Sequence, residues 1–110
     1  MIDKIARAYL EYRANPSDDR FDDWVAVDRM VHNDPEQGWK VILRLVELAA
    51  GDEDALIYIG AGPLEDLLRL YPFVADDAKE EAKDNPALQR ALSGARYWGN
   101  PYGDEPGPGT

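Results

Sequence analysis

Two glycines and a proline interrupt the most apolar part of the chain, in the segment Gly60-Ala61-Gly62-Pro63. Apolar residues at helical spacing flank the segment on both sides, whereas glycine and proline disfavour the interior of a helix. The segment therefore predicts a junction between two short helices, which Gly60 ends in the left-handed conformation and Gly62-Pro63 restarts. Gly60, Gly62, Pro63 and Glu65 are the residues expected to form a structural elbow there.

Similar signals divide the rest of the chain into helices. Asp34-Pro35 and Asn85-Pro86 each place a capping side chain before a proline, and Asp52 follows Gly51 as a third cap. Apolar residues recur at three- and four-residue spacing after these starts, and alternating β-branched runs are lacking. Helices are predicted near residues 2–12, 20–32, 35–49, 52–59, 63–71, 76–83 and 86–92.

The predicted fold class is all-α, a compact irregular bundle of about five to seven short helices. Short antiparallel pairs would also suit an α-solenoid, although no repeat of about 30 to 45 residues is evident. Residues 1–98 are expected to form one helical domain, and the Gly/Pro-rich residues 99–110 a mobile tail. The predicted core comprises Trp24, Val25, Trp39, Ile42, Leu43, Val46, Leu56, Ile59, Leu64, Leu67, Leu68, Leu88 and Leu92.

The charge of the chain restricts its partners. It holds 22 Asp and Glu against 12 Lys and Arg, a formal net charge of -10. Such a surface repels phosphate backbones and anionic lipids, so neither nucleic acid nor membrane is expected as a partner. The chain has no cysteine, which removes thiolate chemistry and Cys-based zinc sites, and no apolar leader is apparent, so we expect a cytoplasmic protein.

Carboxylates gather in clusters that have two interpretations: solvated helix faces, or a recognition face for a basic protein. No cluster follows a calcium-loop pattern, and we predict neither a metal nor a cofactor. A third cluster covers residues 76–84. The residues predicted to bind a partner are Asp18, Asp19, Asp22, Asp23, Asp52, Glu53 and Asp54.

Asp28 and His32 are spaced to share one helix face, as a general base and its orienting carboxylate would be. No nucleophile is visible beside them, since Ser17 and Ser93 are the only serines. We therefore predict no catalytic residue and no enzyme. An enzyme that uses Asp28 and His32 would need at least a polar pocket holding both.

The order of Asp34-Pro35-Glu36, Trp39, the segment Ile-Gly-Ala-Gly-Pro-Leu-Glu and Pro86 resembles an uncharacterised family of short bacterial helical domains. The resemblance covers roughly residues 24–92 and leaves out the end after Trp98. It implies a bacterial or phage origin and a compact helical domain. It brings no activity, ligand or catalytic residue.

The function predicted first is a small acidic inhibitor, of the immunity, antitoxin or anti-defence type, that covers a basic surface on a toxin or a nucleic-acid-binding defence protein. A DNA mimic is a close variant. The alternative is a helical scaffold or housekeeping interaction module whose charge serves solubility alone. The sequence leaves open the oligomeric state and the acidic cluster that makes contact.

Overall fold

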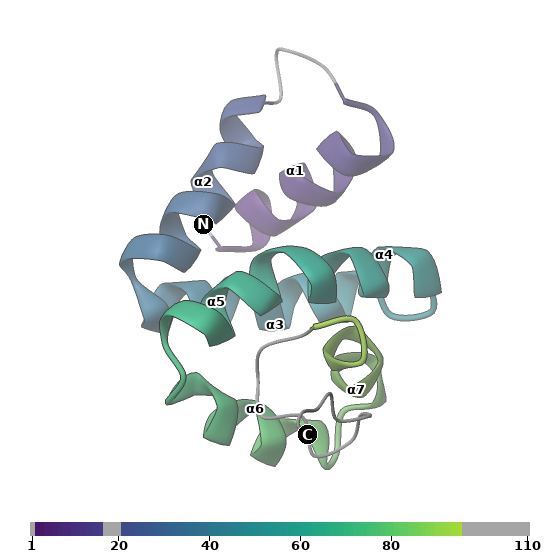
Figure 1. Ribbon diagram of the computed structural model, residues 1–110. Coiled ribbons are helices and arrows are strands. Elements are labelled where there is room, and N and C mark those ends of the chain that lie inside the picture. The colour runs from purple at the N-terminus through teal and green to yellow at the C-terminus, as the bar shows by residue number, and fades with distance from the viewer. Residues whose placement is uncertain (1, 17–20, 96–110) are drawn as a thin grey trace.

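The computed structural model describes residues 2–16 and 21–95, and its regular elements in those ranges are helical (Figure 1). They are α1 (Ile2–Ala14), α2 (Phe21–Asn33), α3 (Pro35–Leu48), α4 (Glu53–Ile59), η2 (Gly60–Leu64), α5 (Glu65–Leu70), α6 (Val74–Ala82) and α7 (Pro86–Leu92). The predicted all-α class is confirmed. The tail predicted for residues 99–110 lies outside the described residues, and the domain boundary at residue 98 stays a prediction.

The predicted helix starts are confirmed by their caps. The side chains of Asp34, Asp52 and Asn85 each accept a hydrogen bond from the backbone N–H three residues later, at 3.1 to 3.2 Å. These bonds satisfy N–H groups that have no partner within their own helix. Gly51, with a φ of 92°, provides the left-handed turn between α3 and α4. Local chemistry alone therefore sets three of the helix boundaries.

The helices form two groups joined by a central stretch (Figure 1). One group consists of α1, α2 and α3, which pack on one another, and in the other α7 packs on α3, α4, η2 and α6. The stretch from α4 through η2 to α5 runs between α2 on one side and α6 and α7 on the other in Figure 1. This stretch contributes side chains to both cavities described below.

Most of the predicted core is buried. The buried members are Ile42, Val46, Leu56, Ile59, Leu64, Leu67, Leu68, Leu88 and Leu92. The other four, Trp24, Val25, Trp39 and Leu43, are half-buried. Among the side chains of α2 that the structure describes, Val27 and Val31 are fully buried, and Trp24 packs against the core from its half-buried position.

The predicted elbow is wrong in its geometry, because the backbone stays helical across it. Gly60 has φ -64° and ψ -43°, which is right-handed, and Leu64 and Glu65 have nearly the same values. The backbone N–H of Glu65 donates to the carbonyl of Gly60 five residues earlier, so residues 60–64 form a π-helical turn. Residues 53–70 are thus one helical stretch with a widened turn in its middle.

Two residues explain the widened turn. Pro63 lies inside the helix, where its ring would clash with the carbonyl four residues earlier in a regular α-helix, and a wider turn relieves that clash. Gly60 lies against α7, because a Cβ added there would lie 2.8 Å from the carbonyl carbon of Ala91 and closer still to its oxygen. Glycine is therefore required at position 60 for the close approach of two helices and not for a left-handed turn.

Candidate functional site

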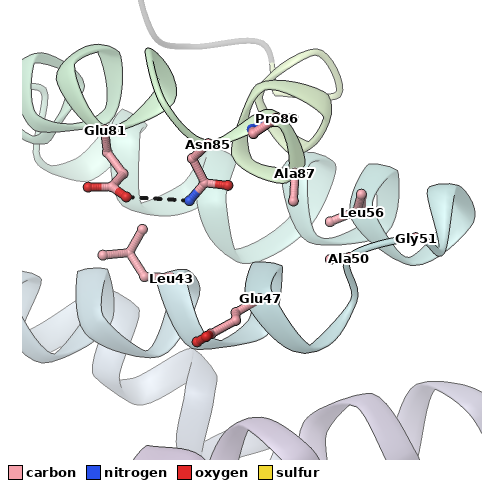
Figure 2. A pocket seen from close by; sticks show the side chains of 9 residues that line it. All are labelled: Leu43, Glu47, Ala50, Gly51, Leu56, Glu81, Asn85, Pro86 and Ala87. Carbon is pink, nitrogen blue, oxygen red and sulfur yellow. Dashed lines mark hydrogen bonds between the residues drawn. The ribbon is translucent and has the colours of Figure 1, made fainter.

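A large open cavity lies where α3, the start of α4 and the junction between α6 and α7 meet, and we call it the acidic groove (Figure 2). Its volume is about 700 Å³. Leu43, Leu56, Pro86 and Ala87 supply its apolar surface. Glu47 from α3 and Glu81 from α6 lie on opposite sides of it in Figure 2, and Asn85 donates a hydrogen bond to Glu81 at 3.4 Å.

The segments around the acidic groove are strongly negative. Residues 47–54 contain four carboxylates and no basic residue, and residues 74–87 contain five carboxylates against two lysines. Lys83 is paired with Glu80 at 3.3 Å. This lysine therefore does not neutralise Glu81, which lines the groove. The groove therefore combines an apolar surface with a negative field, which favours positively charged ligands.

The predicted partner-binding residues fall in different places. Asp52 caps α4 through its side chain, Glu53 is paired with Arg90 of α7, and Asp54 is exposed beside them, so this cluster adjoins Gly51 at the edge of the groove. Asp22 is exposed near the start of α2, which lies far from α6 and α7 in Figure 1. Asp18, Asp19 and the side chain of Asp23 lie outside the described part of the chain.

A network of exposed ion pairs ties the groove to α1. Arg44 lies within 2.8 Å of both Asp3 and Glu47, and Asp3 also pairs with Arg7 at 2.8 Å. Hydrogen bonds from Arg7 and Arg44 hold the pKa of the Asp3 carboxyl below its ordinary value. Glu47 and Glu81 are the carboxylates that line the groove, and Glu47 shares its charge with Arg44 while Glu81 has no basic partner among the ion pairs of the described residues.

A second cavity, the aromatic pocket, lies between α1, α2, α4 and η2 and has a volume of about 270 Å³. Tyr9, Trp24 and Tyr58 line it, with the Tyr9 ring 6.5 Å from that of Trp24 and 6.0 Å from that of Tyr58. The carboxylates Asp28 and Asp66 line it as well. Aromatic ring faces and carboxylates both attract positive charge, so this pocket is suited to a cation.

Asp28 and His32 share one face of α2, as predicted. Nδ1 of His32 lies 2.8 Å from the backbone carbonyl oxygen of Asp28 and 3.4 Å from its carboxylate. The pocket that an enzyme would require contains Asp28 but is not lined by His32. The structure instead brings Asp66 of α5 to this pair, a residue that lies 34 positions after His32 in the sequence.

Tyr9 is the most strongly perturbed acid in the described residues. Its side chain is 3% exposed, and burial, followed by the neighbouring Tyr58, raises the pKa of its hydroxyl far above the ordinary value of 10.0. The folded protein therefore keeps this hydroxyl protonated to a higher pH than an exposed tyrosine would be.

We expect this burial to produce a distinct loss of stability in alkali. The pKa of Tyr9 is higher in the folded than in the unfolded protein, so the protonated hydroxyl stabilises the fold fully below pH 10. As the pH rises further, the free energy of unfolding falls by about 1.4 kcal/mol per pH unit. The Tyr9→Phe variant lacks this proton, so between pH 10 and pH 11.5 it should lose about 2 kcal/mol less than the wild type. Urea unfolding over a pH series measures the difference. If the free energies of unfolding of the two proteins fall in parallel above pH 10, the prediction is wrong.

A family model described as Family of unknown function (DUF6869) matches residues 12–105, and the chain belongs to that family. The resemblance to an uncharacterised domain family is thereby confirmed. The match runs beyond residue 98, so the expectation that the family pattern leaves out the end of the chain is wrong. No curated protein and no solved structure matches the chain. Among the helices that the structure describes, none has the length and apolar character to span a bilayer.

Proposed function

We propose that this DUF6869 protein is a small acidic protein-binding module that receives a basic segment of a partner protein in the acidic groove. The observation that carries the proposal is the groove itself, in which an apolar surface lies between carboxylates from two different helices (Figure 2). Leu43 and Ala87 are half-buried there, so apolar side chains of a partner can cover them. Their burial supplies affinity, and the carboxylates select the sign of the partner's charge.

The finer proposal is an inhibitor of the immunity, antitoxin or anti-defence type, with a DNA mimic as its variant. The partner would be a basic toxin or defence protein whose positive surface normally binds nucleic acid. The net charge of -10 supports this proposal, because a strongly negative protein is attracted to such surfaces over several ångströms before contact. Residues 47–54 and 74–87 concentrate that charge around one groove.

The partner is to be identified by photo-crosslinking in the native host. A benzophenone side chain replaces Ala87 at the groove or, as the control, Asp22 near the start of α2. We expect the position 87 probe to label one basic protein that the position 22 probe does not label. Equal labelling from both positions, or labelling of acidic proteins alone, would contradict the proposed groove.

With the labelled protein in hand, the charge of the groove can be tested directly. The double variant Glu47→Gln, Glu81→Gln keeps both side-chain shapes and removes two charges. We expect its association rate at low salt to fall about 5- to 10-fold, and the deficit to shrink at high salt, because exposed charges steer encounter. Stopped-flow mixing measures the rate.

The matched control is Glu11→Gln, Glu36→Gln, which removes the same charge from exposed positions outside the groove. Its association rate should stay within about 2-fold of the wild type. If both variants associate like the wild type, charge has no part in partner choice, and the helical scaffold becomes the better description of the protein.

A further inference from the structure

Three side chains that the sequence places on two distant segments meet beside the aromatic pocket. One carboxylate oxygen of Asp28, one ring nitrogen of His32 and one carboxylate oxygen of Asp66 all lie within 4.8 Å of one another. Asp28 and His32 project from successive turns of α2, and Asp66 projects from the first turn of α5. Mixed nitrogen and oxygen ligands contributed by two helices are the donor set of many transition-metal sites.

The two helices that carry these side chains are fixed relative to each other. The hydroxyl of Tyr71, the residue after α5, donates to the backbone carbonyl of His32 at 2.5 Å. Leu67 and Leu68, next to Asp66, are buried in the core. The three candidate ligands are therefore held near one another by contacts that leave their side-chain polar atoms unused.

The backbone of Asp28 sets the tautomer of His32. A carbonyl oxygen only accepts hydrogen bonds, so Nδ1 at 2.8 Å from the Asp28 carbonyl carries the proton, and in the neutral ring the lone pair is on Nε2. Histidine ligands generally donate their other N–H to a carbonyl or carboxylate, which fixes the tautomer. Here the backbone of Asp28 performs that function.

Asp66 can serve a cation without giving up its existing partner. Arg69 donates to Oδ1 of Asp66 at 3.1 Å, and a carboxylate has a second oxygen. The side chains of Asp28, His32 and Asp66 are 43%, 38% and 34% exposed, so they have room to change rotamer. Bonds of about 2.0 to 2.2 Å bring tetrahedral ligands to roughly 3.5 Å apart, which requires these atoms to close by about 1 Å.

We propose that Asp28, His32 and Asp66 bind a divalent transition-metal ion of the Zn²⁺ type. The imidazole distinguishes such an ion from Mg²⁺ and Ca²⁺, which prefer oxygen ligands alone. Three protein ligands leave a coordination position open, and the aromatic pocket, lined by two of the three ligands, lies beside it.

This site is independent of the acidic groove. The groove is lined by residues of α3, α4, α6 and α7, whereas the metal ligands lie on α2 and α5 and none of them lines the groove. The DUF6869 protein could therefore bind a basic partner with or without the ion, and failure of one proposal leaves the other intact.

Co²⁺ is the probe for the test, because its visible absorption reports both the coordination number and the ligand type. We expect the full chain to bind one Co²⁺ with an intense four- or five-coordinate spectrum, which one equivalent of Zn²⁺ abolishes. A hundredfold excess of Mg²⁺ should leave the spectrum unchanged. Displacement of Co²⁺ by equimolar Mg²⁺ would show binding to surface carboxylates in general and would overturn the proposal.

The variants His32→Gln and Asp66→Asn each remove one ligand from a partly exposed position, so both should fold, as circular dichroism will show. Each is expected to lower Zn²⁺ affinity at least 10-fold in calorimetric titrations. The control Asp54→Asn removes an exposed carboxylate from α4 and should bind Zn²⁺ within 2-fold of the wild type. Unchanged affinity in either ligand variant, or an equal loss in the control, would sink the assignment.

Discussion

Replacing Gly60 with alanine is expected to destabilise the fold by about 3 kcal/mol or more, at the upper end of what overpacking costs. A Cβ at this position would overlap the backbone carbonyl of Ala91. A flexible side chain could turn away, but a carbonyl within α7 can move only with its helix. The methyl group would therefore separate η2 from α7 and open the core around Leu92, which is 1% exposed.

Gly62→Ala is the matched control for this prediction. Apart from its chain neighbours and its own helix backbone, the atom nearest to a Cβ added at Gly62 is the Tyr9 hydroxyl oxygen at 3.8 Å, an ordinary contact distance. Gly62 precedes Pro63, and a Cβ before proline disfavours the helical conformation, which offsets the helix preference of alanine, so this variant should change stability by about 1 kcal/mol or less. Chemical denaturation measures both variants. Similar stabilities for the two would show that the approach to Ala91 is not what requires glycine.

Truncation of Leu67 to alanine is expected to cost about 3 to 5 kcal/mol, because the site cannot collapse around the missing atoms. Leu67 is fully buried, and its Cδ1 lies 3.3 Å from where a Cβ on Gly38 would be. A Cβ on Gly38 would also lie 3.1 Å from the backbone of Val31. Leu67 therefore fills the point where α5 meets the crossing of α2 and α3.

Leu70→Ala, on the same helix, removes the same atoms from a side chain that is 37% exposed. It should cost about 1 kcal/mol or less, because truncating a partly exposed side chain removes little buried apolar surface and leaves no enclosed cavity. Thermal and urea unfolding of the pair would measure the difference. A loss below about 1 kcal/mol for Leu67→Ala would mean that the contact of α5 with α2 and α3 is looser than the structure shows.

The features that the sequence predicted correctly are local ones. The starts of α3, α4 and α7 follow from Asp34, Asp52 and Asn85, because a capping side chain and the N–H that it satisfies are three residues apart. The apolar stripe of α5 was also correct, since Leu67 and Leu68 are buried. In α3 the predicted stripe was only partly correct, because Ile42 and Val46 are buried but Trp39 and Leu43 are half-buried. Such features require no knowledge of the partner helix.

The features that the sequence could not supply depend on distant contacts. Glycine at position 60 fits either a left-handed turn or a close helix approach, and only the position of Ala91 decides between them. Asp66 reads as a helix-start carboxylate until α5 is placed beside α2, where it joins Asp28 and His32. The burial of Tyr9 likewise depends on Trp24 and Tyr58, which come from other helices.

The widened turn of residues 60–64 has a consequence for how this protein tolerates insertions and deletions. An α-helix rotates about 100° per residue, and a π-helical turn contains one residue more than an α-helical turn. The widened turn absorbs that additional residue, so α4, which faces α7, and α5, which faces α2, keep nearly the phase that a regular helix one residue shorter would give them. Deleting Ala61 would therefore leave Leu67 and Leu68 facing the core. Its cost would come from Pro63, because regular winding brings the proline ring against the carbonyl four residues earlier.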